Sequence, residues 1–135
     1  MAAVVLAHEL VHAYTHIGYD TQDAQWDTKA FGAASSGIIE GLAQYYAEMV
    51  CRKLVETEPR LLAAFEEMLL HQTGPYVVHR SWFGDDLEYD SEAVRDAMLW
   101  TRRRAIAGYD EFKAKLDQAA KELGKERVRQ LDLME

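Results

Sequence analysis

Five consecutive residues near the start of the chain, His8-Glu9-Leu10-Val11-His12, combine two imidazoles with a carboxylate. On a helix, side chains four residues apart return to nearly the same face about 6 Å further along the axis, so both imidazoles can reach one metal ion. Zn²⁺ suits two neutral imidazoles plus a carboxylate, with a fourth position left for water. Glu9 lies roughly 100° round the helix from His8 and can accept a proton from that water. The spacing therefore predicts a hydrolytic zinc site in which Glu9 activates a zinc-bound water.

Chance accounts poorly for this motif. With 5 histidines in 135 residues and this chain's glutamate content, the spacing arises on the order of two times in a hundred. The structural alternative makes both histidines satisfied core residues, but imidazoles buried beside a carboxylate cost desolvation energy unless something binds them. His16 belongs to the same helical stretch, yet it lies about 12 Å from His8 along the axis and is too far away to share the ion.

The third ligand separates the zinc peptidase families that share the H-E-x-x-H motif. Metzincins place a further histidine where this chain has Gly18. Downstream, the stretch Glu40-Gly41-Leu42-Ala43-Gln44-Tyr45 resembles the E-G-x-A-x-Y pattern of the gluzincins, which include the thermolysin-like and aminopeptidase families. The resemblance covers about residues 3–50 of the chain. It implies a zinc metallopeptidase whose third ligand comes from a second helix.

The resemblance also implies a role for each matching residue. His8, His12 and Glu40 are the expected ligands of one zinc ion per chain, and Glu9 is the expected general base and later proton donor. Taken alone, Glu40 is also explained as a first-turn glutamate favoured by the helix dipole. Gln44 lies one turn beyond Glu40 and can orient a ligand histidine, at a place where some relatives carry an aspartate.

Peptidases of this group also need a donor that stabilises the oxyanion formed when water attacks the amide carbonyl. Tyr76 and His79 are the candidates, in a stretch that resembles the tyrosine-bearing segment of several of these families. The alternatives are a core tyrosine and a surface histidine. The implied substrate is a peptide or protein.

Apolar residues recur at helical spacing along most of the chain, so the predicted fold class is mainly α. We expect a compact helical bundle carrying the zinc-binding helix pair, with the small Gly41 and Ala43 allowing the two helices to approach closely. Gly124 marks a possible break in the last helix. The predicted helices cover residues 2–17, 36–55, 59–73, 91–107 and 110–123, with a long loop over 19–35 and a loop or short strand over 76–89.

Relatives of this group usually pair an extended substrate with the edge of a β-sheet that lies upstream of the H-E-x-x-H helix. Here nothing precedes that helix, so we expect the sheet to be absent or truncated. Residues 1–135 are interpreted as one metallopeptidase-like domain, which is either a fragment of a longer protein or a helical variant without the sheet.

Composition narrows the class of partner. The net charge of −8 disfavours nucleic acid, whose phosphates it repels. Arg102-Arg103-Arg104 is interpreted as a solvated helix face. The single cysteine, Cys51, is expected to be a buried small side chain, and no apolar run approaches the roughly 20 residues that cross a bilayer. A cytoplasmic protein that binds neither nucleic acid nor membrane is predicted.

Two functions follow from these observations. The first is zinc-dependent hydrolysis of peptide bonds, which requires Glu9. The second is a non-catalytic helical binding or regulatory module derived from a metallopeptidase, with a structural metal or none. An intact Glu9 favours the first function, because a purely structural metal has no use for it, whereas the short N-terminus favours the second.

Overall fold

The computed structural model describes residues 1–19, 22, 24–84 and 87–134. This part of the chain is mainly helical and contains no strand, which confirms the predicted fold class of a helical bundle without a sheet. The elements in chain order are α1 (Ala2–Ile17), α2 (Thr28–Ala33), α3 (Ser36–Lys53), α4 (Pro59–Leu69), the 3₁₀ helices η1 (Gly74–Tyr76) and η2 (Val78–Trp82), α5 (Leu87–Arg104) and α6 (Tyr109–Met134).

Several boundaries differ from the sequence predictions. Helices η1 and η2 occupy much of the stretch that was predicted to be a loop or a strand. The loop before α3 contains the short α2, whose N-cap Asp27 accepts a hydrogen bond from the Ala30 amide at 2.9 Å. Helix α6 continues through Gly124, because the cost of about 1 kcal/mol for one glycine is offset by the good helix formers around it.

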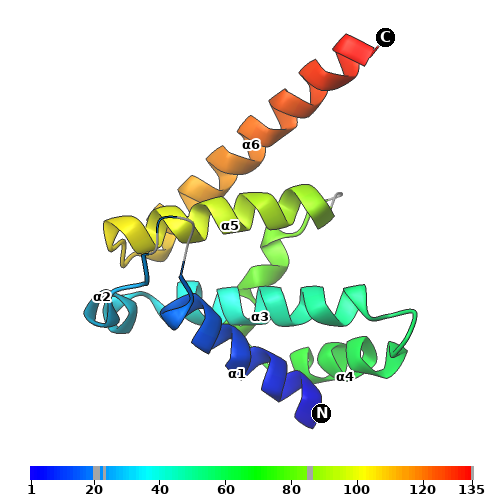
Figure 1. The fold of residues 1–135 in the computed structure, drawn as a ribbon. Helices are drawn as coiled ribbons and strands as arrows, with labels where there is room; N and C mark the ends of the chain where they lie inside the picture. Colours follow the sequence, from blue (N-terminus) through cyan, green and yellow to red (C-terminus); the bar gives the residue numbers. More distant parts are fainter. Residues whose placement is uncertain (20–21, 23, 85–86, 135) are drawn as a thin grey trace.

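Helix α3 lies at the centre of the molecule, with α1 and α4 on one side and α5 and α6 on the other (Figure 1). It begins at the N-cap Ser35, whose hydroxyl accepts from the Gly37 amide at 3.1 Å. One face contributes to the main apolar core, in which it meets η2, α5 and α6. The buried residues of this core are Trp26, Ile38, Leu42, Tyr45, Met49, Trp82, Ala93, Val94, Ala97, Met98, Phe112, Leu116 and Ala119.

A second, smaller core fixes α1 against α3. Val4 of α1 packs with Ala47 and Cys51 of α3 and with Phe65 of α4, and all four are buried. Cys51 is therefore the buried small side chain that its sequence context predicted. Because this core lies one turn from His8, it holds the start of α1 where its first histidine faces α3.

Gly41 permits a close approach, but to a different element from the one expected. A Cβ atom at this position would lie 2.6 Å from Cη2 of Trp82 and 3.2 Å from Cγ1 of Val78. The prediction that Gly41 lets the zinc-binding helices approach each other was wrong. Because Gly41 has no side chain, the Trp82 indole of η2 packs against α3 at this position, which directly follows Glu40 in the sequence.

Arg102 is buried rather than solvated, which corrects the interpretation of the arginine cluster at this residue, whereas Arg103 and Arg104 are exposed as predicted. Its side chain is 7% exposed. Its guanidinium donates to the backbone carbonyls of Gly18, at 2.5 Å, and Ala24, at 2.8 Å. Arg102 thereby ties α5 to the connection that follows α1, and satisfies carbonyl groups that no helix uses.

The second half of α6 projects away from the remaining helices (Figure 1). Its apolar side chains Val128, Leu131, Leu133 and Met134 are exposed. None of the described helices combines the length and apolarity that crossing a bilayer requires.

Candidate metal centre

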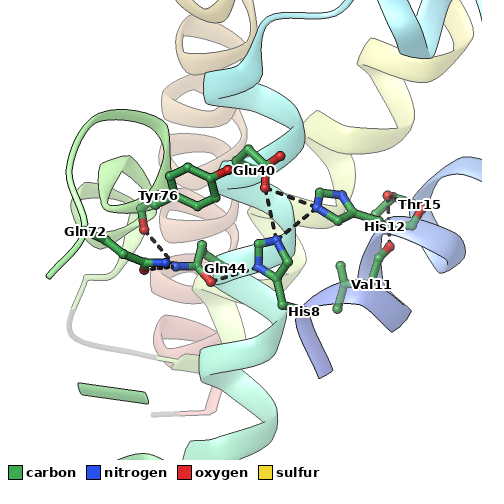
Figure 2. A network of polar contacts seen from close by, with 8 residues as sticks. All are labelled: His8, Val11, His12, Thr15, Glu40, Gln44, Gln72 and Tyr76. Atoms are coloured by element: carbon green, nitrogen blue, oxygen red, sulfur yellow. Dashed lines mark hydrogen bonds and ion pairs between the residues drawn. The ribbon is translucent and has the colours of Figure 1, made fainter. Parts of the chain in front are cut away.

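Three potential ligand atoms meet between α1 and α3. Nε2 of His8 lies 3.0 Å from Oε2 of Glu40, Nε2 of His12 lies 3.1 Å from the same oxygen, and the two Nε2 atoms are 3.0 Å apart. Figure 2 shows both imidazoles and the carboxylate pointing toward one another. The structure thus brings together the three ligands expected from the sequence, which form a possible metal-binding group.

The spacing of α1 explains how the two imidazoles come together. His8 and His12 are one helical turn apart, and their rings meet edge to face with centroids 4.6 Å apart. Glu40 reaches them from the second turn of α3. The three side chains are 12%, 22% and 24% exposed in the order His8, His12 and Glu40, so the site is sheltered but open to solvent.

Gln44 determines the tautomer of His8. Its amide Nε2 donates to the Tyr76 carbonyl at 3.0 Å and to Oε1 of Gln72 at 2.7 Å. A main-chain carbonyl can only accept, so the amide nitrogen must face Tyr76 and the amide oxygen must face His8. That oxygen lies 2.9 Å from Nδ1 of His8, which therefore carries a proton. Gln44 thus contacts His8 as its place one turn beyond Glu40 led us to expect.

The tautomer makes the site suited to a cation. With its proton on Nδ1, a neutral His8 presents a lone pair at Nε2, where it faces a carboxylate oxygen at 3.0 Å. Two lone pairs at this distance repel each other. A proton placed between two of the atoms leaves the third unsatisfied, whereas one divalent ion accepts electron density from all three.

The distances also fit zinc. Tetrahedral coordination with bonds of about 2.0–2.2 Å places neighbouring ligand atoms roughly 3.3–3.6 Å apart. The observed separations of 3.0–3.1 Å would need to open by only a few tenths of an ångström. Side-chain torsions alone can supply so small a change.

A cleft of about 350 Å³ opens over the three ligand atoms. Glu9, the expected general base, is exposed and lines this cleft beside His8 and His12. Tyr76, the expected oxyanion donor, lines it from η1 with its ring centroid 6.3 Å from that of His8, and Figure 2 shows its ring pointing toward Glu40. The remaining lining residues are Val5, Gln44, Met68 and Gln72.

His79 does not lie in the cleft. It is fully buried, with its Nε2 3.1 Å from Oε1 of Glu48, which is itself fully buried. A histidine enclosed in this way cannot donate to a substrate bound over His8, His12 and Glu40. The prediction of His79 as a candidate oxyanion donor was therefore wrong. His79 is also not the surface histidine that was the alternative.

Glu48 is the centre of a buried ionic cluster behind the site. Nε of Arg80 lies 2.8 Å from Oε1, and a terminal nitrogen of Arg52 lies 2.6 Å from Oε2. Burial alone raises the pKa of Glu48, but the hydrogen bond from His79 and the charges of Arg80 and Arg52 outweigh it and hold the pKa below its usual value. The carboxylate is therefore charged at neutral pH and anchors η2 to α3.

The other histidines of the chain have structural surroundings. His16 stacks on Phe31 with ring centroids 4.3 Å apart and lies 3.2 Å from the Thr28 hydroxyl. It is outside the ligand cluster, as expected. His71 lies 3.5 Å from a carboxylate oxygen of Glu67, one turn earlier near the end of α4.

Sequence reasoning missed two parts of the site. Gln72 and the Tyr76 carbonyl hold the Gln44 amide, and the Glu48 cluster fixes η2, which follows the turn at Tyr76. The one available signal for the second was an acidic residue between the apolar Tyr45 and Cys51 on a helix that was predicted from its apolar spacing. No pattern in the sequence pointed to the first.

We compared the chain with known proteins. No protein-family model, no curated protein and no solved structure matches the chain.

Proposed function

We propose that this chain is a zinc-dependent hydrolase that cleaves peptide bonds. The observation that carries the proposal is the meeting of three potential ligand atoms, from His8, His12 and Glu40, in a cleft that Glu9 also lines. Structural zinc sites are usually closed by four protein ligands, whereas catalytic sites have three and an open position. Three ligands below an open cleft match the second kind.

Zinc, when bound, supplies a Lewis acid that polarises a carbonyl and makes water more acidic. Residues of the chain itself supply proton transfer and stabilisation of the oxyanion. Glu9 takes the proton from the attacking water and then passes it to the leaving amine. The hydroxyl of Tyr76, which also lines the cleft, donates to the oxygen on which negative charge develops.

The proposal is tested first by metal content. Mass spectrometry of the purified protein should find about one zinc per chain, and both His12→Ala and Glu40→Ala should remove it, because each variant leaves two ligands. His16→Ala is the matched control, since this histidine belongs to the same helix but contacts Phe31 and Thr28. A wild type that stays metal-free at neutral pH with zinc present would refute the site.

Turnover then separates the hydrolase from a non-catalytic module. Glu9→Gln should retain zinc but lower the rate of cleavage of fluorescein-labelled casein by about 10²–10⁴-fold, which is the usual contribution of general acid–base catalysis. Glu56→Gln, an exposed glutamate at the end of the α3 region, is the control and should cleave normally. Zinc uptake without cleavage, in wild type and variants alike, would favour the binding or regulatory module.

A further inference from the structure

Gln44 contacts both the metal ligands and the segment that carries Tyr76. Its side chain is fully buried, and all three of its polar contacts are made within the site, through one acceptor and two N–H donors. We infer that Gln44 is a positioning residue that couples the geometry of the zinc site to the position of Tyr76. The inference rests on the proposed function, since it assigns Tyr76 to the same reaction.

The turn at Tyr76 packs against α3, but few other polar contacts are described for its main chain. The Tyr76 amide makes only a long bond of 3.4 Å to the Thr73 carbonyl, and the Val77 amide bonds Gly74 at 3.1 Å. These are local contacts within one turn, and the Tyr76 side chain is 37% exposed. Among the described residues, the bonds from the Gln44 amide to the Tyr76 carbonyl and to Gln72 are therefore the polar contacts that tie this turn to α3.

The two halves of the Gln44 amide have separate effects. Its oxygen fixes the proton of His8 on Nδ1 and so frees Nε2 for a metal. Its nitrogen holds the main chain of Tyr76, and thus the distance between the tyrosine ring and the ligands. Because one planar group makes both contacts, a shift of either partner is transmitted to the other.

Substitutions can separate the two effects. Gln44→Glu keeps an oxygen for the His8 proton but presents a carboxylate to the Tyr76 carbonyl, so it should retain zinc and release the turn. Gln44→Met has a similar length and no hydrogen-bonding group, so it should lose both, with zinc affinity reduced about 10–100-fold. Gln72→Ala removes one acceptor of the amide and leaves the contacts with His8 and Tyr76, so it serves as the mild control.

The test combines zinc titration with hydrogen–deuterium exchange of the peptide that contains residues 73–77, with and without added Zn²⁺. In Gln44→Glu, exchange should accelerate by about 5- to 30-fold, as expected for one or two lost hydrogen bonds, while zinc affinity stays near that of wild type. In wild type, zinc should slow exchange of the same peptide, and in Gln44→Glu this protection should be lost.

Unchanged exchange in Gln44→Glu, or an equal loss of zinc affinity in the Glu and Met variants, would overturn the inference. Circular dichroism checks that each variant is folded. If Gln44→Met does not fold, Gln72→Ala keeps the test decisive. Gln72→Ala should bind zinc normally and accelerate exchange less than Gln44→Glu does. Neither readout requires turnover. If the protein binds zinc without cleaving peptides, the proposed function is refuted, but zinc titration and hydrogen–deuterium exchange still decide the role of Gln44.

Discussion

Gly41→Ala should destabilise the protein although alanine is the better helix former. In an unobstructed helix interior, replacing glycine with alanine stabilises by about 0.8–1 kcal/mol. At Gly41, however, the new methyl group would lie 2.6 Å from Cη2 and 2.9 Å from Cζ2 of Trp82. Ordinary carbon contacts are about 3.5–4.0 Å, so the overlap is near 1 Å and the indole must move.

The indole has little room to move. Trp82 is 5% exposed, its Nε1 donates to the Tyr109 hydroxyl at 3.0 Å, and its ring lies 5.1 Å from that of Phe112. Overpacking of this kind costs typically 1–3 kcal/mol. After subtraction of the helix-propensity gain, we expect Gly41→Ala to lower the free energy of unfolding by up to about 2 kcal/mol.

A double-mutant cycle measured by urea unfolding tests this reasoning. Phenylalanine at position 82 lacks the ring atoms that the methyl group meets, so Gly41→Ala should be neutral or stabilising in a Trp82→Phe background. Gly124→Ala is the matched control, because a Cβ at this helical glycine has no neighbour within 4 Å, and it should stabilise. Equal effects of Gly41→Ala in both backgrounds would refute the steric account.

Two further changes have defined outcomes in the same unfolding assay. Glu48→Gln should lower stability at pH 7 by about 1.5–3 kcal/mol, the usual worth of hydrogen bonds to a charged group. Because the folded pKa of Glu48 lies below its ordinary value of 4.5, this stabilisation is full above that value and disappears as the pH falls through the folded pKa; a difference that does not shrink in acid would contradict the assignment. Arg102→Met should cost a similar amount because the two hydrogen bonds from the guanidinium to the Gly18 and Ala24 carbonyls are lost, whereas Arg129→Met, on the exposed part of α6, should cost little.

The meeting of His8, His12 and Glu40 could be predicted because their geometry is local or repeats a known pattern. Helical periodicity alone places His8 and His12 on one face of α1. Glu40 came from the resemblance of its surroundings to a family motif, and α3 does carry it to the two histidines. In the same way, apolar spacing was sufficient to predict a mainly helical fold.

Contacts set by long-range packing could not be predicted. Whether His79 faces the cleft or the interior depends on how η2 turns after Gly74, which has a φ of +59°, and on a carboxylate 31 residues earlier. The sequence shows that position 41 is a glycine, but it does not show that the Trp82 side chain fills the space beside it. Residues distant in sequence decide each of these contacts, and periodicity within one helix carries no information about them.

The two cores that flank α3 fix the rotation of this helix about its own axis. Glu40 and Gln44 lie on one side of this helix, while Leu42, Tyr45 and Met49 are buried in the core on the other. A side-chain tip lies about 5–6 Å from a helix axis, and metal–ligand distances hold to about 0.2 Å. A rotation of α3 by about 2° would move a side-chain tip by that amount, and the side-chain torsions would have to compensate for it. The apolar residues on the far side of α3 therefore fix the rotation at which little compensation is needed, and substitutions there should displace His8, His12 and Glu40 relative to one another as well as weaken the core.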